Sequence, residues 1–287
     1  MEQDGSKNYD EKELESLQDG SQVLLQRHAN SQYNFEYDEM VASGLTEEKY
    51  RALRRKTDLR DAPLSTKGIR QWEDAQPLAN QINASIVCMS PMKRAMETAY
   101  YSFKNHPNFE NIKFIVLPKA KEGIDTPCDI PYNVLDSFEE FKSKFPNLEY
   151  SDINSYEDPK HFYLEDVDQE FAKNILRNKE ESSEDACGSN AFDMIVDCID
   201  KNYSKRLESI RNMVKRTEAV KNRIPQIIKE NNLGKDEKLV IVAHSLFFKV
   251  WTAKWDKSLT EYGKLMLLIY MKLDLSVSIK LTNMNLI

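Results

Sequence analysis

The stretch L-L-Q-R-H-A-N-S-Q-Y-N (residues 24–34) decides how the rest of the chain is interpreted. Its apolar part predicts a buried strand over residues 22–26, and Arg27 and His28 follow that strand directly. A cation beside a titratable ring makes a poor metal site, because the cation repels a metal ion, and it is costly inside a core. The pair is better suited to holding an anion.

The composition limits the kind of anion. The chain has 287 residues, enough for one large domain or two small ones, with 40% hydrophobic and 30% charged residues, as in soluble globular proteins. Its formal charge is −7 at pH 7. This argues against a nucleic-acid partner, because there is no net basic field to collect phosphates. An anion site would be a local positive pocket for a small charged substrate.

The same composition indicates the compartment. The longest apolar run, L-M-L-L-I-Y-M (residues 265–271), is far shorter than the roughly 20 residues that a membrane span needs. The acidic start of the chain does not resemble a signal peptide. The cysteines are widely spaced and form no C-x-x-C pair: Cys88, Cys128, Cys187 and Cys198. We therefore expect reduced thiols in a cytoplasmic protein that has no membrane partner.

Strand and helix patterns alternate along the chain and predict an α/β fold. Residues 1–19 are polar and acidic and are predicted to be disordered, and residues 20–287 are predicted to form a single domain. Strands are expected at 22–26, 84–90, 112–118, 239–243, 265–271 and 276–281. Helices are expected within 36–60, from Ser65 onward, over 93–103 and along 207–228. The fold class predicted is a three-layer α/β/α arrangement with a mainly parallel central sheet.

Two features should interrupt this pattern. Residues 120–200 are rich in Asp, Glu, Ser, Asn and Pro, and we interpret them as an insertion or lid. Pro77 and Pro225 fall within predicted helices and are expected to kink, break or shorten them.

Three predicted strands end in residues that can bind an anion. Arg27 and His28 follow the first strand, Arg94 lies in the helix start after the second, and His244 follows the strand at 239–243. Ligands of such sheets collect outside the carboxyl ends of the strands. A histidine alone at a strand end is usually a satisfied core residue, but this combination indicates a site. Metal binding by the two histidines is the competing reading, and it would require a carboxylate or thiol partner beside two arginines.

At this point the sequence resembles the histidine phosphatase superfamily, also called phosphoglycerate-mutase-like. The R-H-G-E-S-x-x-N signature is matched by R-H-A-N-S-Q-Y-N (residues 27–34), and D-x-P-L-[ST]-x-x-G-x-x-Q by D-A-P-L-S-T-K-G-I-R-Q (residues 61–71). S-P-x-x-R-A-x-x-T-A is matched by S-P-M-K-R-A-M-E-T-A (residues 90–99), and V-x-H-[GS] by V-A-H-S (residues 242–245). The four blocks occur in the family's order.

The resemblance implies a role for each residue. His28 would be the nucleophile, and Arg27, Asn34, Arg94 and His244 would bind the phosphoryl group. The chain departs from the family at Ala29, where a glycine is usual.

The general acid is not fixed by the sequence, because the region after the third strand reads L-P-K-A-K-E-G-I-D-T-P-C-D (residues 117–129) instead of the family's L-x-E-x-x-x-G. Glu122 is the nearest match and the preferred acid, and Asp125 and Asp129 are alternatives.

The function implied is a metal-independent phosphomonoesterase that acts through a phosphohistidine and needs no cofactor. Its substrate would be a small phosphorylated metabolite or a phosphoprotein, and the oligomeric state is left open. Two alternatives remain. One is a catalytically weak or inactive phosphate-binding pseudoenzyme or scaffold, which the Ala29 change and the uncertain acid would suit. The other is a phosphoglycerate-type mutase, for which no sequence feature specifies a second anion site.

Overall fold

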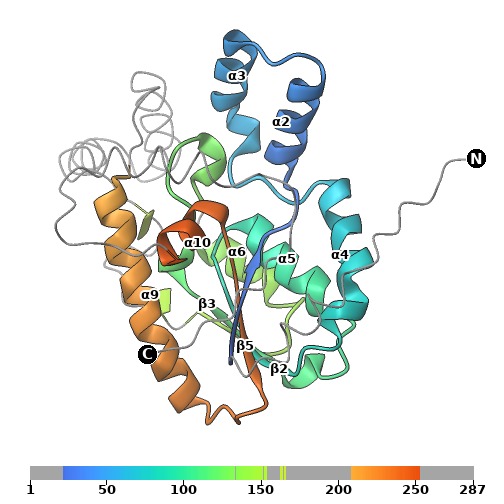
Figure 1. Ribbon diagram of the computed structural model, residues 1–287, viewed down its shortest axis with the longest axis vertical. Coiled ribbons are helices and arrows are strands. Elements are labelled where there is room, and N and C mark those ends of the chain that lie inside the picture. Colours follow the sequence, from blue (N-terminus) through green and yellow to red (C-terminus); the bar gives the residue numbers. More distant parts are fainter. Residues whose placement is uncertain are drawn as a thin grey trace, which may run out of the picture.

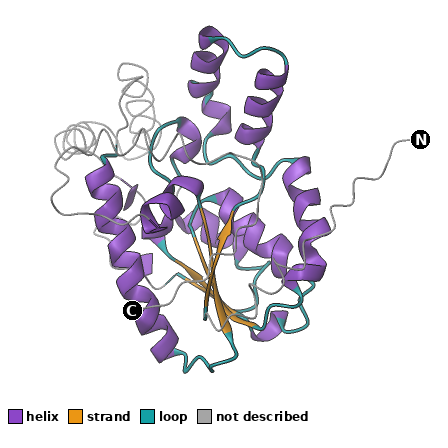
Figure 2. Ribbon diagram, viewed as in Figure 1, coloured by secondary structure: helices purple, strands orange, loops and turns teal. Residues whose placement is uncertain are grey.

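The computed structural model describes residues 22–132, 134–150, 152–153, 162–163, 165 and 208–252. At its centre is a five-stranded, all-parallel sheet in the order β1-β5-β2-β3-β4. The strands are β1 Val23–Arg27, β2 Ala84–Met89, β3 Lys113–Val116, β4 Leu148–Glu149 and β5 Lys238–Ala243. Figure 2 shows these strands in the middle of the molecule, with helices outside them.

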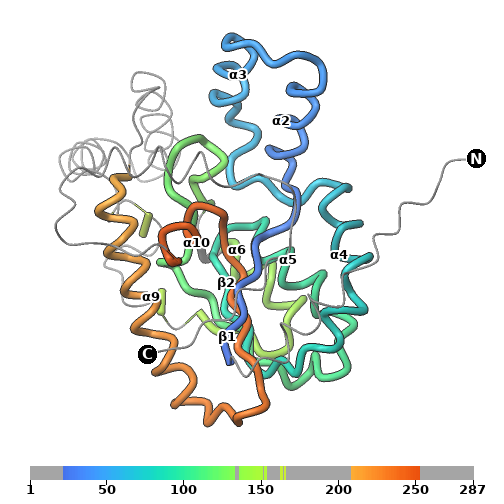
Figure 3. Tube along the Cα trace, viewed as in Figure 1, coloured from blue at the N-terminus to red at the C-terminus, as the bar shows by residue number. Residues whose placement is uncertain are grey.

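The helices cover both faces of the sheet (Figure 1). They are α2 Gln32–Ala42, α3 Glu47–Arg54, α4 Thr66–Ala79, α5 Lys93–Phe103, α6 Val134–Phe141, α9 Ile210–Glu230 and α10 Ser245–Thr252. Short 3-10 turns are η1 Thr57–Leu59, η2 Phe109–Asn111, η3 Pro118–Ala120 and η4 Pro127–Asp129. The tube in Figure 3 shows α9 and α10 to one side of the strands, α4 and α5 to the other, and the α2–α3 pair projecting beyond them.

Two apolar layers separate the sheet from its helices. Leu24, Val87 and Val240 point to the layer that contains Phe103 of α5 and Phe141 of α6. On the opposite face, Leu25, Ile86 and Ile241 meet Ile224 of α9 and Phe247 of α10. Successive strand residues therefore serve opposite layers, as in a parallel sheet buried on both faces. The predicted three-layer α/β/α class is confirmed.

Helices α4 and α9 both continue through their prolines, so neither is broken there, and the predicted kink at each proline stays a prediction. α4 runs through Pro77 and ends at Ala79, and α9 runs through Pro225 and ends at Glu230. Neither helix therefore ends at its proline. In α9, Ile224 before Pro225 and Ile227 after it are buried against the sheet, and this packing outweighs the loss of one backbone hydrogen bond.

The segment after the first strand holds more helix than predicted. We expected one short helix within 36–60, but the structure has α2 and α3 followed by η1. None of the residues of α2 is fully buried, and its apolar face is limited to Tyr33, Tyr37 and Met40, which pack partly buried against the cluster around Leu53 and Leu59. The signal lies at its start, where Ser31 and Asn34 form a reciprocal capping box.

The predicted insertion contributes partly to the sheet itself. Within residues 120–200 the structure describes η4, α6 and β4, and β4 pairs with β3 as the edge strand. The predicted strands at 265–271 and 276–281, the predicted disorder of residues 1–19 and most of the proposed lid lie outside the described residues. The single-domain organisation stays a prediction. None of the described helices is long and apolar enough to cross a membrane.

Candidate active site

The register of the sheet brings the predicted strand ends together. The backbone N–H of His28 donates to the carbonyl of Ala243, and the N–H of Ser90 donates to the carbonyl of Val242, both at 2.9 Å. The residues that follow β1, β2 and β5 therefore leave the sheet side by side. His244 comes directly after Ala243, so it lies beside His28 although the two are far apart in the chain.

The two imidazole rings form the centre of the site. Their centroids lie 5.0 Å apart, and the ring planes are inclined at 58° to each other. His28 is 8% exposed and His244 is 0% exposed. Burial lowers the pKa of both rings well below the usual value, and the positive charge of Arg94 lowers each pKa further. Both rings are therefore neutral at pH 7.

The hydrogen bond of His28 fixes its tautomer. Nδ1 lies 2.7 Å from the carbonyl oxygen of Ala29. Because a carbonyl can only accept, Nδ1 must carry the proton and donate it. The other nitrogen of the neutral ring, Nε2, then has a lone pair.

Helix α5 holds the loop that follows His28. The backbone N–H of Ala29 donates to Oγ1 of Thr98 at 3.0 Å, and Oγ1 of Thr98 donates to the carbonyl of Arg94 at 2.7 Å. Arg94 and Thr98 are four residues apart, so they share one face of the helix. The spacing of R-A-x-x-T in the sequence thus places an arginine and a loop anchor on the same side of α5.

Helix α4 holds the next residue of the loop. The N–H of Asn30 donates to Oε1 of Gln71 at 3.0 Å, and its carbonyl accepts from the N–H of Ser65 at 3.0 Å. Ser65 also caps α4 by accepting from the N–H of Gly68. A Cβ at Gly68 would stand 2.1 Å from the carbonyl oxygen of Asn30. The 61–71 block therefore clamps the loop and leaves room for its backbone.

Ala29 fits this loop without backbone strain. Among the described residues, the positive-φ positions other than glycine are Asp61 and Asn232, so Ala29 does not adopt a conformation that requires glycine. Its methyl group joins a small apolar cluster with Leu64 and Trp72.

The two arginines approach the histidines in different ways. Arg94 is 3% exposed and donates from Nη1 to the carbonyl of Cys128 at 2.7 Å and from Nη2 to Oδ1 of Asp129 at 3.0 Å. These bonds hold the guanidinium in place and leave further N–H groups for an anion. Arg27 is exposed at the end of β1, close enough to Arg94 and Glu122 for their charges to act on its guanidinium group.

The side chain of Asn34 takes part in capping helix α2. Its Oδ1 accepts from the N–H of Ser31 at 3.3 Å and from Oγ of the same residue at 2.9 Å, which completes the cap of α2. Within the described part of the chain, none of its hydrogen bonds reaches Arg27, His28, Arg94 or His244. The structure thus brings Asn34 to the helix start after the loop but shows no contact with the other predicted residues.

The three candidate acids have different surroundings. Asp125 forms a two-pronged ion pair with Arg54, with Nη–Oδ distances of 3.0 and 3.1 Å, and Asp129 is paired with Arg94. Glu122 has no salt bridge with any described residue.

Glu122 accepts backbone hydrogen bonds instead, from Gly123 at 2.9 Å and from Leu246 at 3.4 Å. Burial and then the charge of Asp129 raise the pKa of Glu122. A raised pKa suits a general acid.

A buried charge cluster that the sequence did not reveal lies beside Glu122. Glu208 pairs with Arg216 at 2.5 Å and with Lys121 at 3.4 Å, and all three are essentially buried. Arg216 also donates to the carbonyls of Lys119 and Lys121, at 2.9 and 2.6 Å. The cluster ties the segment before Glu122 to α9. Its members are up to 95 residues apart, so no local pattern could have indicated it.

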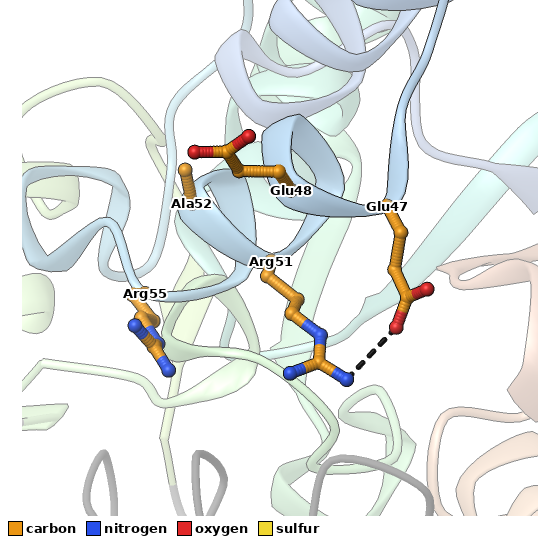
Figure 4. A pocket seen from close by; sticks show the side chains of 5 residues that line it. All are labelled: Glu47, Glu48, Arg51, Ala52 and Arg55. Carbon is orange, nitrogen blue, oxygen red and sulfur yellow. Dashed lines mark hydrogen bonds and ion pairs between the residues drawn. The ribbon is translucent and has the colours of Figure 1, made fainter.

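Two further observations bear on ligands. Among the described residues, no three His, Cys, Asp or Glu side chains come together as a metal site would require. A surface hollow on α3, lined by Glu47, Glu48, Arg51, Ala52 and Arg55, contains none of the predicted site residues (Figure 4). Its carboxylate and guanidinium groups are partly paired with each other, as the Arg51–Glu47 contact at 2.8 Å shows. The hollow is therefore not the candidate active site.

Comparison with known proteins gives a family. Residues 23–122 match the family model described as "Histidine phosphatase superfamily (branch 1)". No curated protein matches the chain. Among solved structures, the chain is similar to a phosphoglycerate mutase from Bacillus anthracis, at 16% identity and a TM-score of 0.40, over 79% of this chain and 76% of the other.

The chain is also similar to a phosphoserine phosphatase from Entamoeba histolytica solved with 3-phosphoglyceric acid, at 19% identity and a TM-score of 0.32, again over 79% and 76%. These low values carry no argument about function. The family rests on the match over residues 23–122, which contains three of the four motifs and the candidate nucleophile. Residues 23–122 of the chain are therefore similar to branch 1 of the histidine phosphatase superfamily.

Proposed function

We propose that the protein is a metal-independent phosphomonoesterase that forms a phosphohistidine at His28, with a small phosphorylated metabolite or a phosphoprotein as substrate. One observation carries this proposal. His28 is a buried, neutral imidazole whose Nδ1–H is hydrogen-bonded to a carbonyl. Its Nε2 therefore carries a lone pair, and the positive charges of Arg27 and Arg94 act on this ring. A nucleophile for an anionic substrate needs that lone pair and that positive field.

The first step transfers the phosphoryl group to the enzyme. Nε2 of His28 attacks phosphorus, and the bond between phosphorus and the leaving oxygen breaks. Arg27 and Arg94 balance the charge on the equatorial oxygens, since phosphoryl transfer is helped chiefly by positioning and by electrostatic stabilisation. His244 and Asn34 would contribute hydrogen bonds to the same oxygens.

Glu122 supplies the proton in this step. Its carboxyl group donates to the departing alkoxide and becomes a carboxylate. In the second step, water attacks the phosphorus of phospho-His28 while the Glu122 carboxylate takes a proton from that water. Phosphate leaves, His28 regains its lone pair, and Glu122 is protonated again.

The alternative of a weak or inactive phosphate-binding scaffold is favoured by one contact. Asp129 pairs with Arg94 inside the site, and this carboxylate reduces the positive charge that Arg94 can offer to a dianion. Phosphate binding without turnover would support that alternative. Among the described residues, no comparable contact favours the mutase, and turnover that depends on a bisphosphate primer would identify a mutase.

The proposed function is tested by the turnover of an aryl phosphate by the purified protein and its His28→Ala variant. Aryl phosphates have good leaving groups, so they report on the nucleophile independently of the acid. We expect turnover by the parent protein and none by the variant. The control is His106→Gln, because His106 bonds to the carbonyl of Ile82 at 2.8 Å and lies outside the site. Undiminished turnover by a folded His28→Ala protein would overturn the proposal.

The acid is tested by comparing two leaving groups. Glu122→Gln should lower kcat for an alkyl phosphate by roughly 10²- to 10⁴-fold, and it should lower kcat for an aryl phosphate much less. The control variants Asp125→Asn and Glu237→Gln each remove a carboxylate that is engaged elsewhere, with Arg54 and with Ser85. Equal losses with both substrates in Glu122→Gln would mean that another group is the acid.

A further inference from the structure

Among the described residues, only Ser90 forms a side-chain hydrogen bond with the ring of His244, the second histidine of the site. Its Oγ lies 2.7 Å from Nε2 of His244, and both residues are 0% exposed. Ser90 follows β2 directly, and His244 follows β5, the neighbouring strand. Ser90 is also the first residue of the S-P-x-x-R-A block.

The proton in this hydrogen bond belongs to the serine. Oγ of Ser90 already accepts from the backbone N–H of Met92 at 3.2 Å. A hydroxyl has a single proton, and among the described residues the remaining neighbour of this oxygen is Nε2 of His244. Either direction leaves one buried donor without an acceptor among the described residues: the Ser90 hydroxyl if Nε2 donates, or Nδ1–H if Ser90 donates. Only Nδ1–H belongs to a ring that lies 5.0 Å from that of His28, where a bound anion can accept its proton, so we assign the donor role to Ser90 and the acceptor role to Nε2.

The other nitrogen of His244 must then carry the proton of the neutral ring. Nδ1 is buried and has no hydrogen-bond partner among the described residues. A buried N–H without an acceptor is unfavourable, and such exceptions require an explanation. The ring stands 5.0 Å from that of His28 and in the field of both site arginines, so the missing acceptor should be an anion.

We propose that Ser90 is a positioning residue that holds His244 as the Nδ1–H tautomer, so that His244 donates to the phosphoryl group while His28 offers a lone pair to it. This inference rests on the proposed function, since it names a task within the same site. The two histidines then have opposite tautomers, each set by an oxygen of the protein: the Ala29 carbonyl for His28 and the Ser90 hydroxyl for His244. In this arrangement His28 attacks phosphorus and His244 binds the phosphoryl group.

The tautomers can be read by nitrogen–proton correlation NMR of protein labelled with ¹⁵N-histidine, in buffer without phosphate. We expect His244 to show a protonated Nδ1 and a bare Nε2, and Ser90→Ala to lose this preference. The spectrum needs no catalytic turnover, so it separates this inference from the proposed function. A proton on Nε2 of His244 in the parent protein would overturn the inference even if His28 proves to be the nucleophile.

Binding of inorganic phosphate, measured by titration calorimetry, gives the second readout. Ser90→Ala should weaken binding by roughly 10- to 100-fold, because the donor to the anion is no longer fixed. Ser90→Thr keeps a hydroxyl and should restore most of the affinity.

Ser102→Ala is the matched control. Ser102 is equally buried, and its hydroxyl donates to the backbone carbonyl of Thr98 and accepts from Nε2 of Gln26, both at 2.7 Å, without contacting a histidine. We expect its phosphate affinity to stay within about threefold of the parent. Unchanged affinity in Ser90→Ala, or an equal loss in Ser102→Ala, would contradict the inference.

Discussion

The two sides of the site are built differently. On the proposed nucleophile side, residues 27–31, the N–H of His28 bonds to Ala243 of β5, and the following loop is held by α4 and α5 through the two motifs at 61–71 and 90–99. On the proposed acid side, residues 118–129, Arg54 of α3 and Arg94 of α5 bond to Asp125 and Asp129. Lys121 and Glu122 are instead bonded to residues 87 to 124 positions further along the chain. The loop after His28 is thus fixed by motifs of the matched region, whereas the surroundings of Glu122 depend on buried charges and an amide from the distant end of the chain.

The largest effect is expected on the acid side, from Glu208→Gln. This change leaves the buried cations of Arg216 and Lys121 without their carboxylate. Breaking one partner of a buried ion pair typically costs about 3–5 kcal/mol. Urea unfolding should show a loss of that size, and turnover of an alkyl phosphate should fall with it because Glu122 loses its support.

Glu218→Gln is the matched control for this change, since Glu218 pairs with Lys221 on the exposed side of the same helix. Its effect on the free energy of unfolding should stay within about 0.5 kcal/mol. Equal effects of the two changes would mean that the buried cluster does not stabilise the acid side.

The next effect is a dependence of stability on pH that arises from His28 and His244. Both have a folded-state pKa well below the unfolded value near 6.5, so below about pH 6.5 the unfolded chain binds more protons. Their stabilisation is complete above that pH and falls by about 1.4 kcal/mol per pH unit for each histidine as the pH drops. Asp61, whose pKa burial raises to about 6, acts in the opposite direction below pH 6.

Replacing one histidine isolates this contribution. Between pH 7 and 6, the free energy of unfolding of His244→Gln should fall less steeply than that of the parent protein, measured by urea unfolding in phosphate-free buffer. Identical slopes would show that the ring of His244 is not held neutral in the folded state.

Gly68→Ala should disturb the loop after His28 most directly. The added methyl group would stand 2.1 Å from the carbonyl of Asn30, so the loop after His28 or helix α4 must shift. Such overpacking costs about 1–3 kcal/mol, and turnover of aryl and alkyl phosphates should fall together because the nucleophile is displaced. In the control Gly234→Ala, the methyl group meets only the flexible carboxylate of Glu237, at 3.0 Å. Equal stability of the two variants would contradict the close packing of α4 against the loop after His28.

This contrast explains what the sequence could predict. Arg27, His28, Arg94 and His244 were identified because each follows a strand pattern, and parallel strands deliver their carboxyl ends to one edge. The strand pattern therefore predicted that these residues converge, whereas the role of each came from the family resemblance. Glu122, Asp125 and Asp129 could not be told apart, because what distinguishes them is their ion-pair partners, and a pairing such as Arg54 with Asp125 spans 71 residues. The charge cluster around Glu208 was missed for the same reason.

A smaller effect is expected from Thr98→Val, which keeps the shape but removes the oxygen that binds the N–H of Ala29. Leaving that N–H buried and unpaired should cost about 1–3 kcal/mol, at the lower end if the loop relaxes. Thr217→Val is the control, because the hydroxyl of Thr217 is buried without a partner among the described residues, and its removal should be neutral or stabilising. Thermal unfolding of both variants would show the difference, and equal losses would exclude a role for the Thr98 anchor.

The smallest effect concerns the hollow on α3, which belongs to neither side. Arg51→Gln removes an exposed ion pair with Glu47 and should change the free energy of unfolding by less than about 0.5 kcal/mol. Phosphatase turnover should be unchanged as well. A marked loss of turnover in this variant would mean that α3 takes part in binding the substrate.

The central claim is that His28 receives the phosphoryl group. The most direct measurement is to mix the protein with a ³²P-labelled phosphate ester, quench it at alkaline pH, where phosphohistidine survives, and locate the label by mass spectrometry of its peptides. We expect a label on His28 that appears within one turnover and is lost when unlabelled substrate is added. A label on another residue, or steady turnover with no labelled protein at any time, would contradict it.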